Sequence, residues 1–372
     1  MNIKHSSFLL DFLNFEKKSS TDTIIKLSGK KNIKGNLLIK SFSLNEGNNN
    51  IEIKNLIVDK NNIINQFDNI SLNYFDKDDQ KNSININKNN KDYVLKGETF
   101  NADNLIENLL INTTKSKFFI NDLKIKINIK KVRMDSEYQL NNLKGELIFK
   151  NQKLFSGNLS GDFPENKKLN FAVRSKDNNK VTTFTIDHAK PIVKRYKFVK
   201  GFEGGILDFY STKKLNESNS QLKIYDFKLK ELPVLTKILT LASLQGIADI
   251  LSGEGIGFDV FEMNFKNNAN LMTIEEIYAI GPAISILMEG YVEKGDLISL
   301  RGTLVPATTI NKFIGSLPVL GKILVGSKTG EGVFGVSFKI KGPPKELETS
   351  VNPIKTLTPR FITRTLEKIK KN

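Results

Sequence analysis

The first two hundred residues are dominated by apolar and polar side chains that alternate along the chain. In residues 123–130, Leu or Ile occupies every second position, and Lys or Asn fills the positions between. Because successive side chains of a strand point to opposite faces, this alternation predicts a half-buried β-strand. Residues 51–57, 83–87 and 170–173 alternate similarly, with turn-forming Asn, Asp, Lys and Gly clusters between them. We therefore expect many short antiparallel strands on one long sheet with a single apolar face.

A four-residue motif, Leu-Lys-Gly-Glu, punctuates this region. It occurs identically at residues 95–98 and 143–146, and in looser form at 33–36 and 300–303. A β-prone run follows three of these copies, whereas the copy at 95–98 leads into a segment with helical periodicity. The irregular spacing favours repeated strand–turn–strand units over a solenoid of fixed period.

One short helix is predicted within this strand-rich region. Leu105, Ile106, Leu109 and Leu110 share one side of a helical wheel over residues 103–110. Asp103 is the predicted N-terminal cap, because its carboxylate can accept hydrogen bonds from the free backbone N–H groups of the first turn.

The amino-acid composition changes near Lys200. Asn and Lys runs become sparser, and Gly, Pro, Leu and Ile become more frequent. This change predicts two regions, a strand-rich region over residues 1–200 and a second region over residues 201–372. The second region begins with an expected hairpin of residues 204–210 and 221–227.

Two nearly identical segments mark the second region. Residues 232–239 read LPVLTKIL and residues 317–324 read LPVLGKIL. In the first copy, Ile238, Leu239, Leu241 and Ala242 lie with Leu235 on one side of a helix. Farther along, Leu244, Ile247, Ala248, Ile250 and Leu251 form an arc on the opposite side. The helix therefore either breaks near residues 243–246 or is covered on both sides. A proline suits the first helical turn, and Gly253 suits the C-terminal cap.

The second copy predicts a helix that is interrupted by proline. Ile310, Phe313, Ile314 and Leu317 share one face, and Pro318 forces a break before it. A new short helix can then run over residues 318–325, and strands resume at 333–340. The end of the chain, from Pro359, predicts a short basic amphipathic helix.

Composition narrows the possible partners without selecting one. The chain has 372 residues, 56 Lys and Arg against 40 Asp and Glu, and a formal net charge of +16. Nucleic acid, a phospholipid surface and an acidic polymer are all compatible with this charge, and biased codon usage would give a similar Lys- and Asn-rich composition. The absence of Cys removes disulfides, cysteine zinc sites and thiol catalysis. An uninterrupted apolar run of roughly 18 residues is lacking, so no segment is expected to span a membrane unaided.

Candidate catalytic patterns are weak. The two His residues, His5 and His188, are far apart, and the Asp187-His188 pair has no accompanying nucleophile motif. The glycine-rich residues 253–257 follow a helix and open a strand, the reverse of a dinucleotide-binding loop. We expect no enzyme, no cofactor and no metal site. Nucleic-acid binding is also not expected, because Lys greatly outnumbers Arg and the Phe residues alternate as inward strand positions.

Several segments together resemble one known family. They are residues 233–259 (PVLTKILTLASLQGIADILSGEGIGFD), 279–282 (AIGP), 302–307 (GTLVPA), Asn311, 317–321 (LPVLG), 331–335 (EGVFG) and 351–353 (VNP). This set is similar to the C-terminal region of AsmA-like proteins of the YhdP type, in the bacterial bridge-like lipid-transfer superfamily. The first half of the chain is compatible with the same family.

The resemblance implies an elongated, twisted antiparallel β-sheet groove, mainly β with a few helices, which short amphipathic helices cap. It further implies a periplasmic, inner-membrane-associated protein that moves phospholipids between inner and outer membranes. Family members are usually longer and begin with a transmembrane anchor, and we expect no such anchor within these 372 residues. The family has no catalytic residues to carry over.

These expectations combine into one functional hypothesis and one alternative. The apolar strand faces bind or conduct phospholipids, while the two LPVL segments cap the groove or dock on a membrane together with the basic tail. The alternative is a structural or assembly protein of the envelope that binds a protein partner. Ordinary core packing would also explain the helices. The residues proposed for lipid binding or capping are Leu235, Ile238, Leu239, Leu241, Leu244, Ile247, Ile250, Leu251, Ile310, Phe313, Ile314, Leu320, Ile323 and Leu324.

Overall fold

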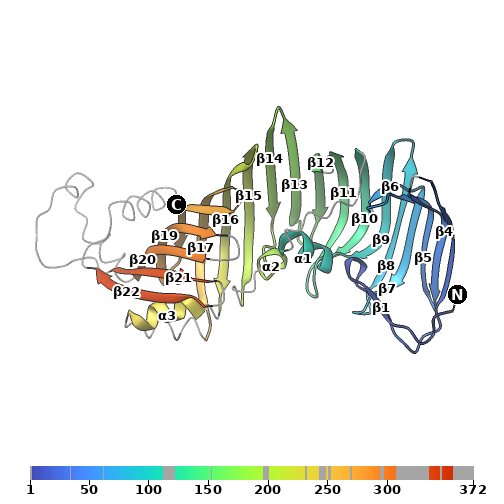
Figure 1. Cartoon of the computed structure of the whole chain (residues 1–372). Coiled ribbons are helices and arrows are strands. Elements are labelled where there is room, and N and C mark those ends of the chain that lie inside the picture. The colour runs from blue at the N-terminus through green and yellow to red at the C-terminus, as the bar shows by residue number, and fades with distance from the viewer. Residues whose placement is uncertain are drawn as a thin grey trace, which may run out of the picture. The chain divides into compact units, whose positions relative to one another are not determined.

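The computed structural model of the chain consists mainly of β-strands (Figure 1). It describes residues 2–33, 35–61, 63–111, 122–151, 153–195, 201–230, 233–242, 249, 253–268, 270–293, 297–306, 335–343 and 346–354. The chain divides into two compact units, Met1–Asp187 and His188–Asn372. The sequence predicted a division near residue 200.

The first unit is built on a sheet in which sequence neighbours are mostly also spatial neighbours (Figure 1). Long runs of alternating apolar and polar residues form its strands, as period-two patterning requires. The described strands of this sheet are β3 (Ile24–Lys31), β4 (Leu37–Glu46), β5 (Asn49–Val58), β6 (Ile64–Gln66), β7 (Asn69–Phe75), β8 (Lys81–Asn89), β9 (Asp92–Asn101), β10 (Leu123–Arg133), β11 (Gln139–Lys150), β12 (Lys153–Asp162), β13 (Lys168–Lys176) and β14 (Asn179–Ile186).

One pair of strands in this sheet is parallel, which the sequence analysis did not predict. β9 and β10 run in the same direction, with Leu95 opposite Ile127 and Phe100 opposite Val132. A parallel pair requires a crossover connection in place of a tight hairpin. Helix α1 (Asp103–Ile111) lies in that connection.

The N-terminal segment folds back onto this sheet. Strands β1 (Phe8–Leu10) and β2 (Phe15–Lys17) form a separate two-stranded sheet around the short 3₁₀-helix η1 (Asp11–Leu13). Leu13 and Phe15 pack in a buried cluster with Leu44, Leu72 and Tyr74 of the main sheet. This cluster is the principal core of the first unit.

The second unit contains an antiparallel meander. Its described strands are β15 (Glu203–Lys214), β16 (Glu217–Leu229), β17 (Ile256–Asn267), β18 (Leu271–Ile280), β19 (Ile284–Glu293), β20 (Leu297–Pro306), β21 (Gly335–Gly342) and β22 (Glu348–Ile354). The expected hairpin at the start of this region is confirmed as β15 and β16.

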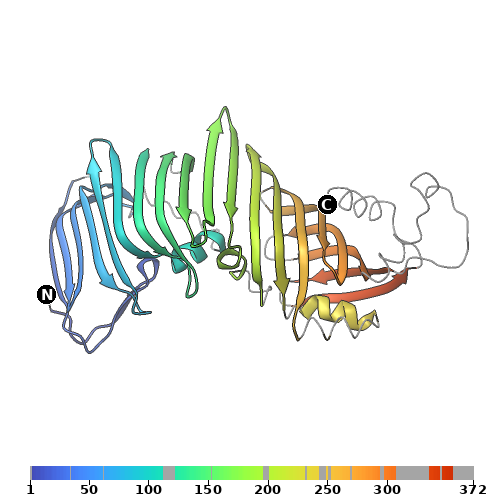
Figure 2. The ribbon, with the colours of Figure 1, turned by 180° about the vertical axis from the view of Figure 1, so that it is seen from behind.

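Two helices are described in the second unit. The short helix α2 (Lys190–Val193) contacts β15, and α3 (Pro233–Leu241) contacts β22. Figure 2, the view from behind, again shows α3 beside the end of the meander. Pro233 begins α3, as predicted, and the N–H of Gly253 donates to the carbonyl oxygen of Asp249 at 2.9 Å.

Two local predictions are wrong. Gly97, Gly145 and Gly302 lie inside β9, β11 and β20, so three of the four Leu-Lys-Gly-Glu-like motifs are not turns. They occupy sites where strands approach closely: a Cβ on Gly145 would lie 2.0 Å from the carbonyl oxygen of Asn158. Only Gly35 lies in a turn, with a φ of 82°.

The capping prediction for α1 is the second error. The carbonyl oxygen of Ala102 accepts the bond from the N–H of Ile106, so Asp103 is the first helical residue and Ala102 occupies the cap position. Asn101 takes part at this helix start, because its Oδ1 accepts a bond of 3.2 Å from the N–H of Asp103.

The predicted fold class is confirmed: the protein is mainly β, largely antiparallel and open, with a few short helices. The strands are longer than expected, and several contain ten or more residues. None of the helices within the described residues is long and apolar enough to cross a membrane.

Candidate functional site

A cross-strand row of apolar residues, which includes one glycine, crosses the sheet of the first unit. Residues that are directly paired across strands point to the same face, so the strand register identifies such a row. We call this set row A. It consists of Leu27, Phe42, Ile53, Ile70, Ile86, Leu95, Ile127, Gly145, Leu159, Phe171 and Phe184.

The row next to row A on the opposite face of the same strands is polar. One position along each strand from row A, the paired residues form a second row, which we call row P. Row P consists of Lys26, Ser43, Glu52, Ser71, Asn85, Lys96, Asn128, Lys144, Ser160, Asn170 and Thr185. The expected sheet with one apolar face is therefore present in this unit.

The side chains of row A are neither fully buried nor isolated. Leu27 is 63 % exposed, and the others are half-buried. Eleven strands at a spacing of about 4.8 Å make the row roughly 48 Å long. The hydrocarbon core of a bilayer, which is two acyl chains thick, measures about 30 Å, so row A is longer than one extended acyl chain. A contiguous apolar strip of this size is unusual for a surface that faces only water.

Two buried clusters flank row A. The first contains Phe15 and Leu44, and the second contains Phe67, Tyr93 and Leu123. Ile70 and Ile86 of row A pack against both clusters. Row A therefore lies between two covered parts of the apolar face and remains the accessible part.

The second cluster contains a tyrosine with a satisfied hydroxyl. Tyr93 Oη donates to the carbonyl oxygen of Phe67 at 3.1 Å and lies 3.2 Å from the Phe67 nitrogen, whose N–H it accepts. Burial raises the pKa of the Tyr93 hydroxyl, the bond to the Phe67 backbone lowers it, and the nearby charge of Asp68 raises it, with a net increase. This residue therefore stays neutral over the physiological range and serves as a structural element beside row A.

The second unit carries an equivalent apolar row, which we call row B. Row B consists of Phe209, Leu222, Met263, Ile277, Met288, Gly302, Phe338 and Val351, one residue from each of eight strands. Ile277 and Phe338 are buried and the remaining members are half-buried. Like Gly145 in row A, Gly302 interrupts row B with a glycine.

The glycine of row B makes room for its neighbours. A Cβ on Gly302 would lie 2.6 Å from Met288 Cγ and 2.7 Å from Phe338 Cζ. These two side chains therefore occupy the space that a larger residue would fill. Row B stays apolar across this position despite the missing side chain.

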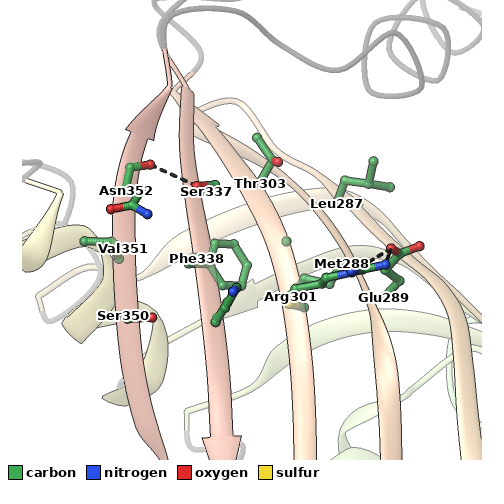
Figure 3. A pocket seen from close by; sticks show the side chains of 12 residues that line it. Leu287, Met288, Glu289, Arg301, Thr303, Ser337, Phe338, Ser350, Val351 and Asn352 are labelled. Carbon is green, nitrogen blue, oxygen red and sulfur yellow. Dashed lines mark hydrogen bonds and ion pairs between the residues drawn. The ribbon is translucent and has the colours of Figure 1, made fainter.

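A hollow of about 430 Å³ lies on strands β19 to β22, around Gly302 (Figure 3). Two polar contacts lie in its lining: Arg301 Nη2 lies 2.8 Å from Glu289 Oε1, and Ser337 Oγ donates to the backbone carbonyl oxygen of Asn352 at 3.1 Å. Figure 3 shows both interactions. The volume of the hollow is within the usual range for a small-molecule pocket.

The predicted site residues fall into two groups. Leu235, Ile238 and Leu239 are buried in α3, whereas Leu241 is 49 % exposed. Leu241, which the helical wheel grouped with Leu235, lies roughly 120° from it around the helix and outside the covered surface. The remaining predicted residues lie outside the described residues: Leu244, Ile247, Ile250, Leu251, Ile310, Phe313, Ile314, Leu320, Ile323 and Leu324. The second LPVL segment and the basic tail also lie outside them.

The individual residues of rows A and B were not predicted from the sequence. The alternation shows which side chains of a strand share a face, but a row needs the register between strands. The only sequence signal for the register was the glycine of the repeated motif, since Gly97 and Gly145 mark close strand approaches.

Metal-ligand geometry and comparisons with known proteins give no indication of the function of the chain. Within the described residues, no group of three or more His, Asp or Glu side chains is placed to hold a metal ion. No protein-family model, curated protein or solved structure matches the chain. The motifs of the sequence and the apolar rows are therefore the features of the chain that bear on its function.

Proposed function

We propose that this chain is a non-enzymatic cell-envelope protein that binds or conducts phospholipids along its apolar sheet faces. The single observation that supports this proposal is row A, a strip of mostly half-buried aliphatic and aromatic side chains across eleven strands that only Gly145 interrupts. Acyl chains on this strip would gain about 0.8 kcal/mol per buried methylene, while the headgroups remain in water.

The location belongs to the same proposal. The resemblance to AsmA-like proteins favours the periplasm, association with the inner membrane and phospholipid movement between the two membranes. Rows A and B suit this role because each row is apolar along its whole length. A carrier for a chain of repeated methylenes needs a long surface of constant character, whereas an enzyme needs a few converging polar groups.

The experiment is a lipid-binding measurement with face-matched variants. Ile127→Asn with Leu159→Asn makes two half-buried positions of row A polar. Lys126→Asn with Lys144→Asn changes two exposed positions on the opposite face. Phospholipid that co-purifies with the protein is identified by mass spectrometry after extraction, and binding of a fluorescent phospholipid is titrated.

The row A variant should bind the fluorescent phospholipid at least about tenfold more weakly, since a loss of about 1.4 kcal/mol corresponds to that factor. The opposite-face variant should bind like the unmodified chain. Far-ultraviolet circular dichroism establishes that both variants are folded. Equal binding by both folded variants, or no phospholipid binding by the unmodified chain, would contradict the proposal.

A second candidate is a structural or assembly protein that pairs with a strand of a partner protein. Strand β3 favours it, because all of its residues except Ile25 are exposed and Leu27 and Ile24 are large apolar residues. Exposed edge strands recruit extended peptides through backbone hydrogen bonds. Absence of phospholipid from the purified protein, together with capture of an envelope protein that β3 substitutions abolish, would favour this candidate.

A further inference from the structure

The turn between β3 and β4 presents an isoleucine to solvent. Ile33 has a relative exposure of 107 %, so its whole side chain is in water. Two backbone bonds close the turn, from Asn32 N–H to the Asn36 carbonyl oxygen at 2.9 Å and from Gly35 N–H to the Asn32 carbonyl oxygen at 3.0 Å. The Asn36 N–H also donates to Asn32 Oδ1 at 2.9 Å. The turn is thus held in one conformation that keeps Ile33 outside.

Lysines surround this apolar tip. Lys30 and Lys31 precede it at the end of β3 and are exposed. Lys60, in the turn after β5, lies beside it, because a Cβ on Gly35 would be 3.7 Å from Lys60 Cβ. None of these lysines forms an ion pair with an acidic residue within the described part of the chain.

Asp59, next to Lys60, forms hydrogen bonds within its own turn. Asp59 Oδ1 accepts bonds from the N–H groups of Asn61 at 2.9 Å and Ile63 at 2.8 Å. The tip therefore combines a fully exposed aliphatic side chain with cationic side chains that have no acidic partner there. Leu37, opposite Lys31 on β4, extends the apolar part and is 42 % exposed.

This combination fits one kind of surface. An aliphatic side chain gains by leaving water for the acyl boundary of a bilayer, and lysines gain beside anionic headgroups while their stems lie along apolar atoms. A single-stranded nucleic acid would instead require aromatic side chains for stacking. Ile33, Leu37 and the lysines provide none.

We infer that the β3–β4 tip docks on a bilayer that contains anionic phospholipids, with Ile33 inserted and Lys30, Lys31 and Lys60 against the headgroups. This contact goes beyond the proposed function and does not depend on it, because it needs no acyl chain on row A or row B. It also differs from the helices and the basic tail, which the sequence analysis favoured for membrane docking.

The chain contains no tryptophan, so one substitution supplies a unique fluorescent reporter. Ile33→Trp, in the full chain, is mixed with vesicles of phosphatidylcholine or of an equimolar mixture of phosphatidylcholine and phosphatidylglycerol. With the mixed vesicles, the emission should shift to shorter wavelength, and brominated acyl chains should quench it. Leu105→Trp is the matched control: Leu105 is 40 % exposed on a helix that also carries Asp103 and Glu107. Its emission should not change.

Sedimentation with the same vesicles tests the two contributions separately. Lys30→Glu with Lys31→Glu should lower partitioning onto mixed vesicles at least about tenfold, since each lysine contributes roughly fivefold near an anionic surface. Ile33→Asp should lower it as well, whereas Leu105→Asp should not. Circular dichroism and the unfolding midpoint verify that the variants fold.

Several outcomes would overturn the inference. One is an unchanged emission of the Ile33→Trp variant on mixed vesicles, and another is equal partitioning of Ile33→Asp and the unmodified chain. Binding to soluble heparin without vesicle binding would instead identify the tip as a general polyanion site. Loss of fluorescent phospholipid binding by row A variants with intact vesicle docking would separate this contact from the proposed function.

Discussion

The hydroxyl of Tyr74 donates a hydrogen bond of 2.7 Å to the carbonyl oxygen of Leu13. Tyr74 lies on β7, and Leu13 ends η1, so this bond ties the N-terminal segment to the main sheet of the first unit. The ring of Phe15 meets the Tyr74 ring edge-on at 5.6 Å. Both contacts help to hold the segment that covers one side of row A, and each of them can be tested.

Replacing Tyr74 with Phe keeps the ring and removes the donor. The Leu13 carbonyl oxygen loses this bond, and we expect the free energy of unfolding to fall by about 1–3 kcal/mol. Urea unfolding, followed by circular dichroism, measures the change. Tyr210→Phe is the control, because Tyr210 is 47 % exposed and should change the unfolding free energy very little. Equal effects of the two variants would show that the bond contributes nothing.

The glycine of row B leads to a second prediction. Gly302→Ala places a Cβ 2.5 Å from the carbonyl oxygen of Leu287 as well as against Met288 and Phe338, so we expect destabilisation by about 1–3 kcal/mol. Gly257→Ala meets nothing within 4 Å and should be neutral or slightly stabilising. Thermal unfolding of the two variants compares them directly. A stable Gly302→Ala protein would mean that the strands can move apart at this position.

Helix α3 offers a pair of leucines two positions apart. Leu239 is fully buried and Leu241 is 49 % exposed. Leu239→Ala should lower the unfolding free energy by about 2–5 kcal/mol, because it removes packed atoms and leaves a cavity. Leu241→Ala should change it by no more than about 0.5 kcal/mol. If Leu241→Ala instead weakens vesicle binding while stability is unchanged, the exposed side of α3 contacts membrane.

Alkaline pH should destabilise the protein through its buried tyrosines. Burial is the main cause that raises the folded-state pKa of Tyr93, whereas the unfolded chain titrates at about 10. A raised folded-state pKa stabilises the fold fully below about pH 10, and this contribution is lost as the pH rises through the folded-state value. Urea midpoints across this range should fall less steeply for Tyr93→Phe than for the unmodified chain. Parallel declines would exclude Tyr93 as the cause.

The strands of the fold could be predicted from the sequence because the alternation of apolar and polar residues is a local property. Residues 123–130, for example, show their inward and outward positions without any knowledge of the neighbouring strands. The parallel pair of β9 and β10 was not accessible, since the direction of a pairing depends on the path of the connection through α1. The residues of row A could likewise not be predicted from the sequence, because the row is assembled from residues on eleven strands.

The errors have specific physical causes. The Leu-Lys-Gly-Glu motifs were interpreted as parts of strand–turn–strand units, but Gly97 and Gly145 lie within strands, where glycine permits close backbone approach. For Leu241, the helical wheel gives the direction of the side chain but not the width of the surface that covers the helix. Leu235 and Leu239 are centred on that surface, and Leu241 lies beyond its edge.

The uniform alternation also has a consequence for how the chain folds. A strand displaced by one residue would exchange its apolar and polar faces, but a displacement by two residues would leave both faces as they are. Hydrophobicity alone therefore cannot separate the native pairing from such a slipped isomer. The bulges at Ser28–Gly29 and Ser83–Ile84 are not equivalent under a two-residue shift, and neither is Gly145 opposite Leu159. These irregular positions therefore select the native register of an otherwise repetitive sheet. Correct strand pairing depends on them more than on the many isoleucines.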